Sequence, residues 1–149
     1  MLTIRPARSK DHRDLEALLQ HASLATGEQQ QALMDNPDAM QVSVENLVHT
    51  LVAEIDGRIA GFCTVLPLPG AAAELDALFI DPTFWRKGLG KALYSAAERQ
   101  IELAGATSLT VVSGQYAQPF YAALGFDRAG VEMTRFGPAV RLSKRLDLT

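Results

Sequence analysis

Two kinds of hydrophobic pattern follow one another along this chain. In short runs apolar and polar residues alternate, and in longer runs apolar residues recur every three or four positions. The first pattern predicts strands and the second predicts amphipathic helices. A strand is expected at residues 2–7. A helix is expected at about 10–25, with Leu15 and Leu18 on one face and Ser9 as its N-cap.

The middle of the chain predicts a β-hairpin. Strand-like segments at 49–55 and 58–66 flank Asp56-Gly57, a two-residue turn of the primed type. A third strand is expected at 74–80. The other expected elements are helical pieces at about 28–35 and 43–49, a helix over 88–104, a strand over 108–112, a helix over 116–124, and strands over 126–136 and 139–146 that pair through Gly137-Pro138.

This order of elements predicts a mixed α/β (α+β) sheet with helices on its faces. The chain has 149 residues, of which 48% are hydrophobic and 21% charged, as is ordinary for a globular protein. It has no linker rich in proline, glycine and serine, so one domain over residues 1–149 is expected.

Composition excludes several classes of function. The net charge of -3 gives no reason to expect a nucleic-acid partner. Cys63 is the only cysteine, so an intramolecular disulfide is impossible, and neither a cysteine-based zinc site nor any other metal site is expected. No apolar run approaches 18 residues and the first residues do not resemble a signal peptide, so we expect no membrane span and a cytoplasmic location.

The most informative stretch runs from 78 to 93, where a strand, a turn and a glycine-rich loop precede an amphipathic helix. Backbone N–H groups in the first turn of a helix lack intrahelical partners and lie at the positive end of the helix dipole. Because Gly88 and Gly90 have no Cβ, a pyrophosphate can approach these groups closely. The cations around the same point are Arg86, Lys87 and Lys91.

A Gly-x-Gly loop has other interpretations. It also fits a helix that simply starts after a flexible turn with solvated basic residues, and it occurs in dinucleotide-binding folds. A Rossmann fingerprint needs three glycines early in a parallel βαβ unit, but here the loop follows three strands and Leu93 stands three positions after Gly90. A Walker A loop needs Gly-Lys-Ser/Thr, which the sequence lacks.

Two segments together resemble the GNAT acetyltransferase superfamily. LFIDP at 78–82 followed by RKGLG at 86–90 resembles its acetyl-CoA-binding segment, Gln/Arg-x-x-Gly-x-Gly/Ala, and AQPFYAALGF at 117–126 resembles its late helix, which ends Phe-Tyr-x-x-x-Gly-Phe. There are two departures. Trp85 stands at the Gln/Arg position of the loop, and Tyr116 stands where an asparagine is often found.

The resemblance implies the GNAT acyl-CoA N-acyltransferase fold, whose central mixed sheet is mostly antiparallel and flanked by helices. It also implies that acetyl-CoA is the cosubstrate and that its acetyl group moves directly to a primary amine while both are bound. The cosubstrate would lie between the strands at 78–80 and 108–112. By this resemblance the cofactor-binding residues are Leu78, Phe79 and Ile80 for the pantetheine arm, Arg86, Lys87, Gly88, Leu89, Gly90 and Lys91 for the pyrophosphate, and Tyr116 beside the arm.

The resemblance also suggests catalytic residues. Tyr121, in the Phe-Tyr motif, is the candidate general acid, since a phenol with a pKa near 10 suits proton delivery to a thiolate. Glu74 is the candidate general base, and Asp76, two residues along on the same strand face, is the alternative. Either carboxylate could instead be a solvated edge charge or an anchor for an ammonium group. Cys63 reads as a small buried strand residue and not as a nucleophile.

Two other readings of the same fold are a non-catalytic module that senses acyl-CoA and a toxin- or antitoxin-like partner protein. Tyr121 and the two carboxylates favour the enzyme. The expected partners are acetyl-CoA and an amine acceptor, with a homodimer through the last strands suggested by family analogy only. A small amine, an amino acid and a peptide N-terminus all remain open as acceptors.

Overall fold

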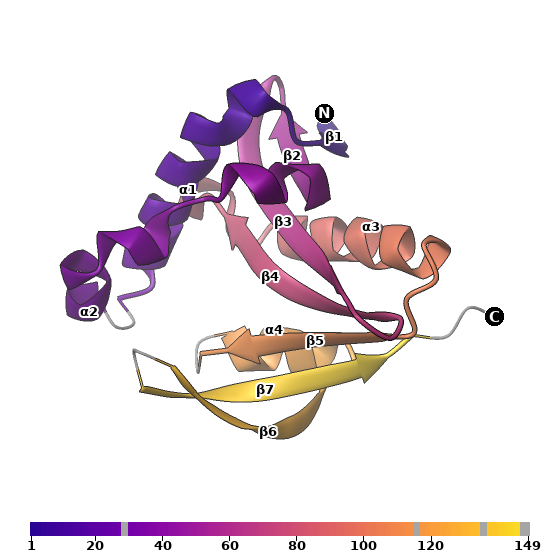
Figure 1. Ribbon diagram of the computed structural model, residues 1–149. Helices are drawn as coiled ribbons and strands as arrows, with labels where there is room; N and C mark the ends of the chain where they lie inside the picture. The colour runs from indigo at the N-terminus through magenta and orange to yellow at the C-terminus, as the bar shows by residue number, and fades with distance from the viewer. Residues whose placement is uncertain (28–29, 115–116, 135–136, 147–149) are drawn as a thin grey trace.

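The computed structural model describes residues 1–27, 30–114, 117–134 and 137–146. Its centre is a seven-stranded sheet in the order β1-β2-β3-β4-β5-β7-β6, in which only β4 and β5 pair in parallel (Figure 1). The predicted mixed, mostly antiparallel sheet is therefore confirmed. The strands are β1 Leu2–Pro6, β2 Thr50–Ile55, β3 Arg58–Leu68, β4 Ala72–Ile80, β5 Ser108–Ser113, β6 Asp127–Thr134 and β7 Gly137–Arg145.

Helices cover both faces of this sheet. The α-helices are α1 His12–Ala25, α2 Gln30–Asp35, α3 Leu89–Leu103 and α4 Gln118–Ala123. Short 3-10 turns lie at Ser9–Asp11, Pro37–Met40, Val44–His49 and Pro82–Phe84. No helix in these described ranges is long and apolar enough to cross a membrane.

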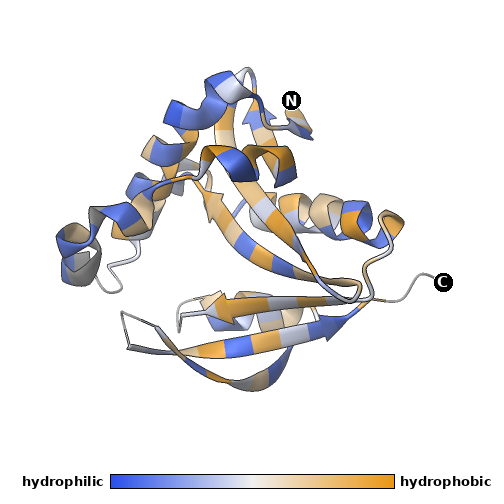
Figure 2. Ribbon diagram, viewed as in Figure 1, coloured by the Kyte–Doolittle hydropathy of each residue, from blue (hydrophilic) through white to orange (hydrophobic). Residues whose placement is uncertain are grey.

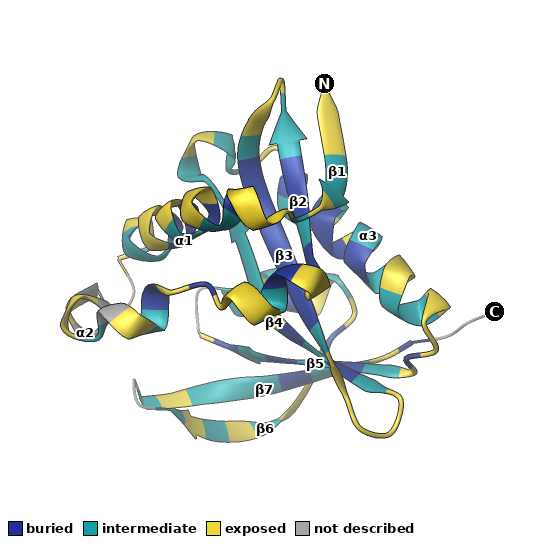
Figure 3. Cartoon of the chain, turned by 45° about the horizontal axis from the view of Figure 1, so that its top comes forward, coloured by how far each residue is buried: buried dark blue, intermediate teal, exposed yellow. Residues whose placement is uncertain are grey.

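Two buried clusters show which helix covers which face. Leu15 of α1 packs with Val52 and Phe62 on one face, and Leu93 of α3 packs with Leu109 on the other. Figures 2 and 3 show the same division, with polar, exposed residues on the outer side of α1 and buried residues along β2 and β3. The spacing of apolar residues thus predicted the buried stripe of α1 correctly. In α3 the same spacing predicted the burial of Leu89 and Leu93 but was wrong for Leu103, which is 80% exposed at the end of the helix.

The hairpin turn has the predicted geometry, since Asp56 and Gly57 both have positive φ angles, 51° and 81°.

Two other expectations were wrong. Ser9 does not cap α1: the first turn is a 3-10 turn in which the Asp11 carboxylate accepts from the Arg8 N–H at 2.7 Å. Gly137 pairs with Thr134, so Gly137 and Pro138 belong to β7 and do not form the turn.

The sheet opens between its two parallel strands. β4 and β5 pair over three positions, Ala72 to Glu74 against Ser108 to Thr110, whereas β4 stays paired with β3 as far as Ile80. Figure 1 shows the two strands diverging from there. We call this divergence the split. It leaves one edge of β4 unpaired in the interior of a sheet, where backbone polar groups normally have partners.

Side chains behind the split hold the two halves together. Lys144 of β7 donates to Glu98 of α3 at 2.8 Å and lies 5.4 Å from the centre of the Tyr94 ring, and the Tyr94 hydroxyl also donates to Glu98. Tyr94 stacks edge-on against Phe126. Because these contacts cross from α3 to the last strands, the sheet can diverge in front without separating behind.

Among the described residues, no helix covers the opposite side of the last three strands. None of the described residues of β5, β6 or β7 belongs to the buried cluster beneath α1. Figure 1 shows α4 behind β5 and no helix in front of β7. We call this side, along β5, β7, β6 and the paired part of β4, the open face.

Candidate active site

The unpaired edge of β4 carries the three residues predicted for the pantetheine arm. Leu78, Phe79 and Ile80 are all half-buried, and each pairs with β3 on the other side. In an extended strand, alternate residues direct their N–H and C=O groups to opposite edges. The segment therefore presents backbone donors and acceptors toward the split.

A β-bulge lies just before this segment. Thr64 pairs with Ala77 while Val65 pairs with Leu75, so Asp76 is an extra residue on β4. The expectation that Glu74 and Asp76 share a face rested on unbroken alternation, and the bulge breaks that alternation between them. Desolvation raises the pKa of Asp76 even though its side chain remains exposed to solvent.

Trp85 fixes the loop that follows β4. Its indole Nε1 donates to the carbonyl oxygen of Ile80 at 2.7 Å. The residue that departs from the family pattern therefore ties the loop back to the strand. Beyond it, Arg86 and Gly88 both have left-handed backbones, with φ angles of 63° and 79°. Such a conformation is strained for a non-glycine residue like Arg86 and clusters at functional sites.

The first turn of α3 offers unpaired backbone donors. Gly88 is the N-cap and no side chain caps it, and the first helical bond runs from Ala92 N–H to the Gly88 carbonyl at 3.1 Å. The N–H groups of Leu89, Gly90 and Lys91 have no partner among the described residues. The cations Arg86, Lys87 and Lys91 are exposed around them. This corner can hold an anionic group such as a diphosphate.

Close packing joins this corner to α4. A Cβ added to Gly90 would meet Phe120 at 3.4 Å, so the first turn of α3 lies against the ring that precedes Tyr121. The Tyr121 ring packs edge-on against Phe120 and Phe126, with centroid distances of 5.2 and 5.5 Å. The two sequence motifs therefore meet in space.

Tyr121 points into the helix-side core and is only 6% exposed. Burial raises the pKa of its phenol, with a smaller contribution from the nearby Cys63. Cys63 of β3 pairs with Leu78 of β4. Because Cys63 is also near the Tyr121 phenol, the phenol lies close to the part of β4 that is predicted to bind the pantetheine arm. The phenol stays protonated at physiological pH, although it is a weaker acid than a solvated tyrosine.

Glu74 lies at the last pair before the split, opposite Thr110 of β5. The Thr110 hydroxyl is buried and has no hydrogen-bond partner among the described residues. Sequence analysis missed Thr110, although the alternation along 108–113 places it between the buried Leu109 and Val111. Its position beside Glu74 could not be known without the register of the two strands.

The predicted set is thus brought together around the split, with one exception. Tyr116 lies outside the described residues. Among the described residues, no group of three or more His, Cys, Asp or Glu side chains is arranged to hold a metal ion.

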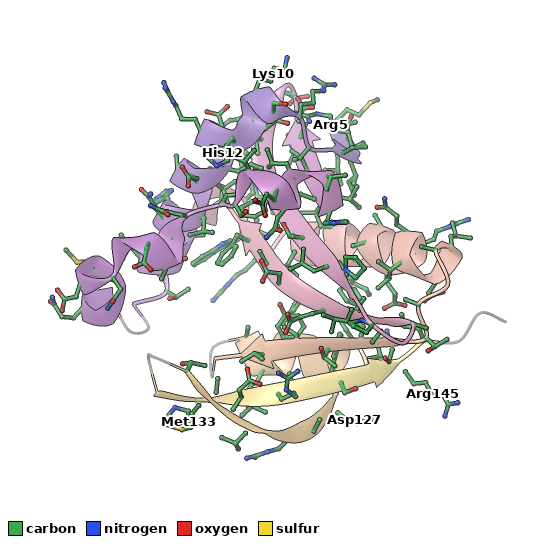
Figure 4. The ribbon with its side chains drawn as sticks, viewed as in Figure 1. Arg5, Lys10, His12, Asp127, Met133 and Arg145 are labelled. Carbon is green, nitrogen blue, oxygen red and sulfur yellow. The ribbon has the colours of Figure 1, made fainter. Side chains whose placement is uncertain are left out.

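Two cavities lie away from this site. One, of about 590 Å³, is bordered by α1 and by charged side chains that include Arg5 and Lys10, both labelled in Figure 4. The other, of about 460 Å³, is mostly apolar and lies beneath the end of α3, with His49 and Cys63 in its lining. Neither includes the loop before α3 or Tyr121, so neither is the candidate active site.

A family comparison agrees with this geometry. The model of the acetyltransferase (GNAT) family matches residues 15–126, which include the split, the glycine-rich loop and Tyr121. The chain belongs to the GNAT family. It is therefore an acyltransferase by class. No curated protein sequence matches the chain significantly.

Solved structures of other GNAT proteins share the fold. The PaiA N-acetyltransferase of Thermoplasma acidophilum, in complex with coenzyme A, superposes with a TM-score of 0.80 at 20% identity over 98% of this chain and 99% of that one. The ribosomal-protein-S18-alanine N-acetyltransferase of Escherichia coli gives 0.75 at 21% identity over 100% and 96%. N-acetylglutamate synthase of Neisseria gonorrhoeae, complexed with coenzyme A and N-acetyl-glutamate, gives 0.77 at 20% identity over 99% of this chain and 35% of that one.

Proposed function

We propose that this GNAT protein transfers an acetyl group from acetyl-CoA to a primary amine by direct transfer in a ternary complex. The observation that carries the proposal is the early end of the β4–β5 pairing at Glu74 and Thr110. It leaves an unpaired strand edge that leads to the uncapped first turn of α3, and this turn packs against Phe120, next to Tyr121. Coenzyme A in two similar structures supports the choice of cosubstrate.

The residues present fit the chemical groups of acetyl-CoA. The N–H groups of Leu89, Gly90 and Lys91, with three exposed cations around them, suit a diphosphate. The unpaired edge of β4 suits the two amides of a pantetheine arm, which can extend the sheet as an added strand would. The diphosphate and the pantetheine arm of the same ligand thus have complementary partners at the first turn of α3 and on the adjoining edge of β4.

When bound, acetyl-CoA supplies an acetyl thioester, so the reaction forms an N–C bond, breaks a C–S bond and moves one proton from the amine to the sulfur. Tyr121 holds a proton at Oη, and the burial that raises its pKa ensures that this proton is present at neutral pH. Glu74 or Asp76 accepts the amine proton. Desolvation raises the pKa of Asp76, which makes its carboxylate a stronger base than an ordinary aspartate.

The test of Tyr121 is Tyr121→Phe, which keeps the ring between Phe120 and Phe126 and removes only the hydroxyl. Turnover in single-turnover assays should fall by about 10²-fold or more, the usual size of a general-acid contribution. The affinity for CoA, measured by calorimetry, should stay the same. Unchanged turnover, with chemistry shown to be rate-limiting, would remove Tyr121 from the mechanism.

The same experiment separates the enzyme from a binding module. Wild-type protein that binds CoA but releases no thiol with any amine would favour an acyl-CoA sensor. If calorimetry detects no binding of CoA, both hypotheses, the enzyme and the acyl-CoA-binding module, are contradicted.

The base is identified from pH profiles of Glu74→Gln and Asp76→Asn. Each substitution keeps the size of the side chain and removes the charge. The variant that lacks the base should lose the limb of the kcat/KM profile that rises with pH, because a required carboxylate is inactive while protonated. The other variant serves as the control and should keep that limb. If both keep it, the amine loses its proton to solvent.

A further inference from the structure

Two side chains of opposite charge project from the open face beside the split. Ala73 and Leu75 belong to the buried cluster beneath α3 and α4, so Glu74 between them points to the other side of the sheet. Leu142 of β7 belongs to the same cluster, so its neighbour Arg141 also points away from the helices. An acidic and a basic side chain therefore share one uncovered surface.

An acceptor must approach the split from this surface. The opposite side is filled by α3 and α4, where Leu93 is 0% exposed and Tyr121 only 6%. In the part of the chain that the structure describes, no helix lies over β5 and β7 on the open face (Figure 1). An incoming molecule therefore meets the side chains of Glu74 and Arg141 next to the split.

Arg141 forms an ion pair that occupies only part of its guanidinium group. Its Nη2 donates to Glu132 of β6, and the side chains of the two residues are 34% and 44% exposed. Among the described residues the other guanidinium nitrogens have no hydrogen-bond partner. An ion pair this exposed contributes little to stability. The guanidinium keeps enough donors for a second carboxylate, and its planar fork suits one.

Glu74 and Arg141 are close enough to act on one small molecule. Glu74 pairs with Thr110, whereas Arg141 pairs with Val112, so Arg141 lies two strand spacings (about 10 Å) across the sheet and two residues (about 7 Å) further along it. Both side chains are long, and the Arg141 guanidinium is bonded to Glu132 on the β6 side of β7. The pKa of Arg141 is raised, chiefly by its hydrogen bond to Glu132 and in small part by the charge of Glu74.

We propose that the acceptor amine carries a carboxylate, as an amino acid does, and that Arg141 binds this carboxylate while Glu74 faces the ammonium group. The inference rests on the proposed function and narrows its substrate class. This part of the open face is dipolar, with the negative Glu74 at the start of the split and the positive Arg141 on β7. An amino acid complements these charges when its ammonium group points toward the split and its carboxylate points toward β7.

The experiment compares aminocarboxylates with matched amines. Thiol release is measured with glycine, β-alanine and 4-aminobutyrate, and with ethylamine and propylamine as partners that lack the carboxylate. The best aminocarboxylate should exceed its matched amine in kcat/KM by about tenfold or more, the effect expected of a charge-assisted contact. Equal use of the two kinds of amine overturns the inference and leaves the proposed function standing.

Two variants then assign the contact. Arg141→Gln should remove the preference for the carboxylate by raising KM for aminocarboxylates alone. Glu132→Gln breaks the same ion pair but leaves the guanidinium in place, so it should keep or strengthen the preference. If both variants lose it equally, Arg141 serves only to hold β6 and β7 together, and the proposal is wrong.

A binding measurement supplies a readout that does not depend on turnover. Calorimetric titration of the CoA-loaded protein with the preferred aminocarboxylate should give binding in wild type and in Glu132→Gln, and at least about tenfold weaker binding in Arg141→Gln. Binding unaffected by Arg141→Gln contradicts the assignment. Failure of every amine to accept an acetyl group would contradict the proposed function itself.

Discussion

Gly61 of β3 tests how tightly the pantetheine segment is held. A Cβ added at this position would lie 2.5 Å from Ile80 Cδ1, 2.9 Å from the Phe79 carbonyl oxygen and 3.2 Å from Leu93 Cδ1. The first contact can be relieved by a rotation of the isoleucine. The second cannot, because a backbone oxygen moves only if β4 moves.

Gly61→Ala should therefore destabilise the protein by about 1–3 kcal/mol, the usual cost of overpacking a core. For a chain of this size the melting temperature falls by roughly 2–4 °C for each kcal/mol. The substitution should also weaken CoA binding, because any relief of the clash displaces Phe79 and Ile80, which carry the unpaired edge.

The matched control is Ile80→Val, which deletes the clashing Cδ1. Alone it should cost about 0.5–1.5 kcal/mol. In the Gly61→Ala background it should cost less or even stabilise, because it removes the closest contact. Urea unfolding of the four proteins gives the coupling energy, and calorimetry gives the CoA affinity. Strict additivity together with unchanged CoA affinity would refute the close approach of β3 to this segment.

Two further predictions concern side chains inside the fold. Thr110→Val removes a buried hydroxyl that lacks a partner among the described residues, so it should stabilise the protein by about 1 kcal/mol; a lower melting temperature in thermal unfolding would mean that the hydroxyl is in fact bonded. Cys63 is 1% exposed and burial raises its pKa to about 12, so the native protein should resist thiol reagents at pH 8 and Cys63→Ala should retain acetyl transfer. Loss of transfer in that variant, with its fold intact by circular dichroism, would favour a covalent intermediate over direct transfer.

The sequence alone predicted the features that depend on neighbours in the chain. The periodicity of apolar residues predicted α1 and α3 and their buried faces, and Asp56-Gly57 predicted the hairpin because both residues adopt positive φ. The glycine-rich loop before α3 was found in the same way, since helix termini and glycine backbones follow local rules. The error at Ser9 has a tertiary cause, because Asp11 is held by Arg5 of β1 at 2.8 Å and occupies the first turn.

Only the tertiary structure decided where distant segments meet. The split depends on strand register: β4 carries one extra residue at Asp76, and its pairing with β5 stops at Glu74. No local pattern encodes such a register, because it is set by the packing of α3 and of the last strands on the same core. For the same reason Arg141 became a candidate only when β7 was seen beside β5, within reach of a glutamate far away in the chain. Local backbone preferences therefore specified the elements, and long-range pairing arranged them into a site.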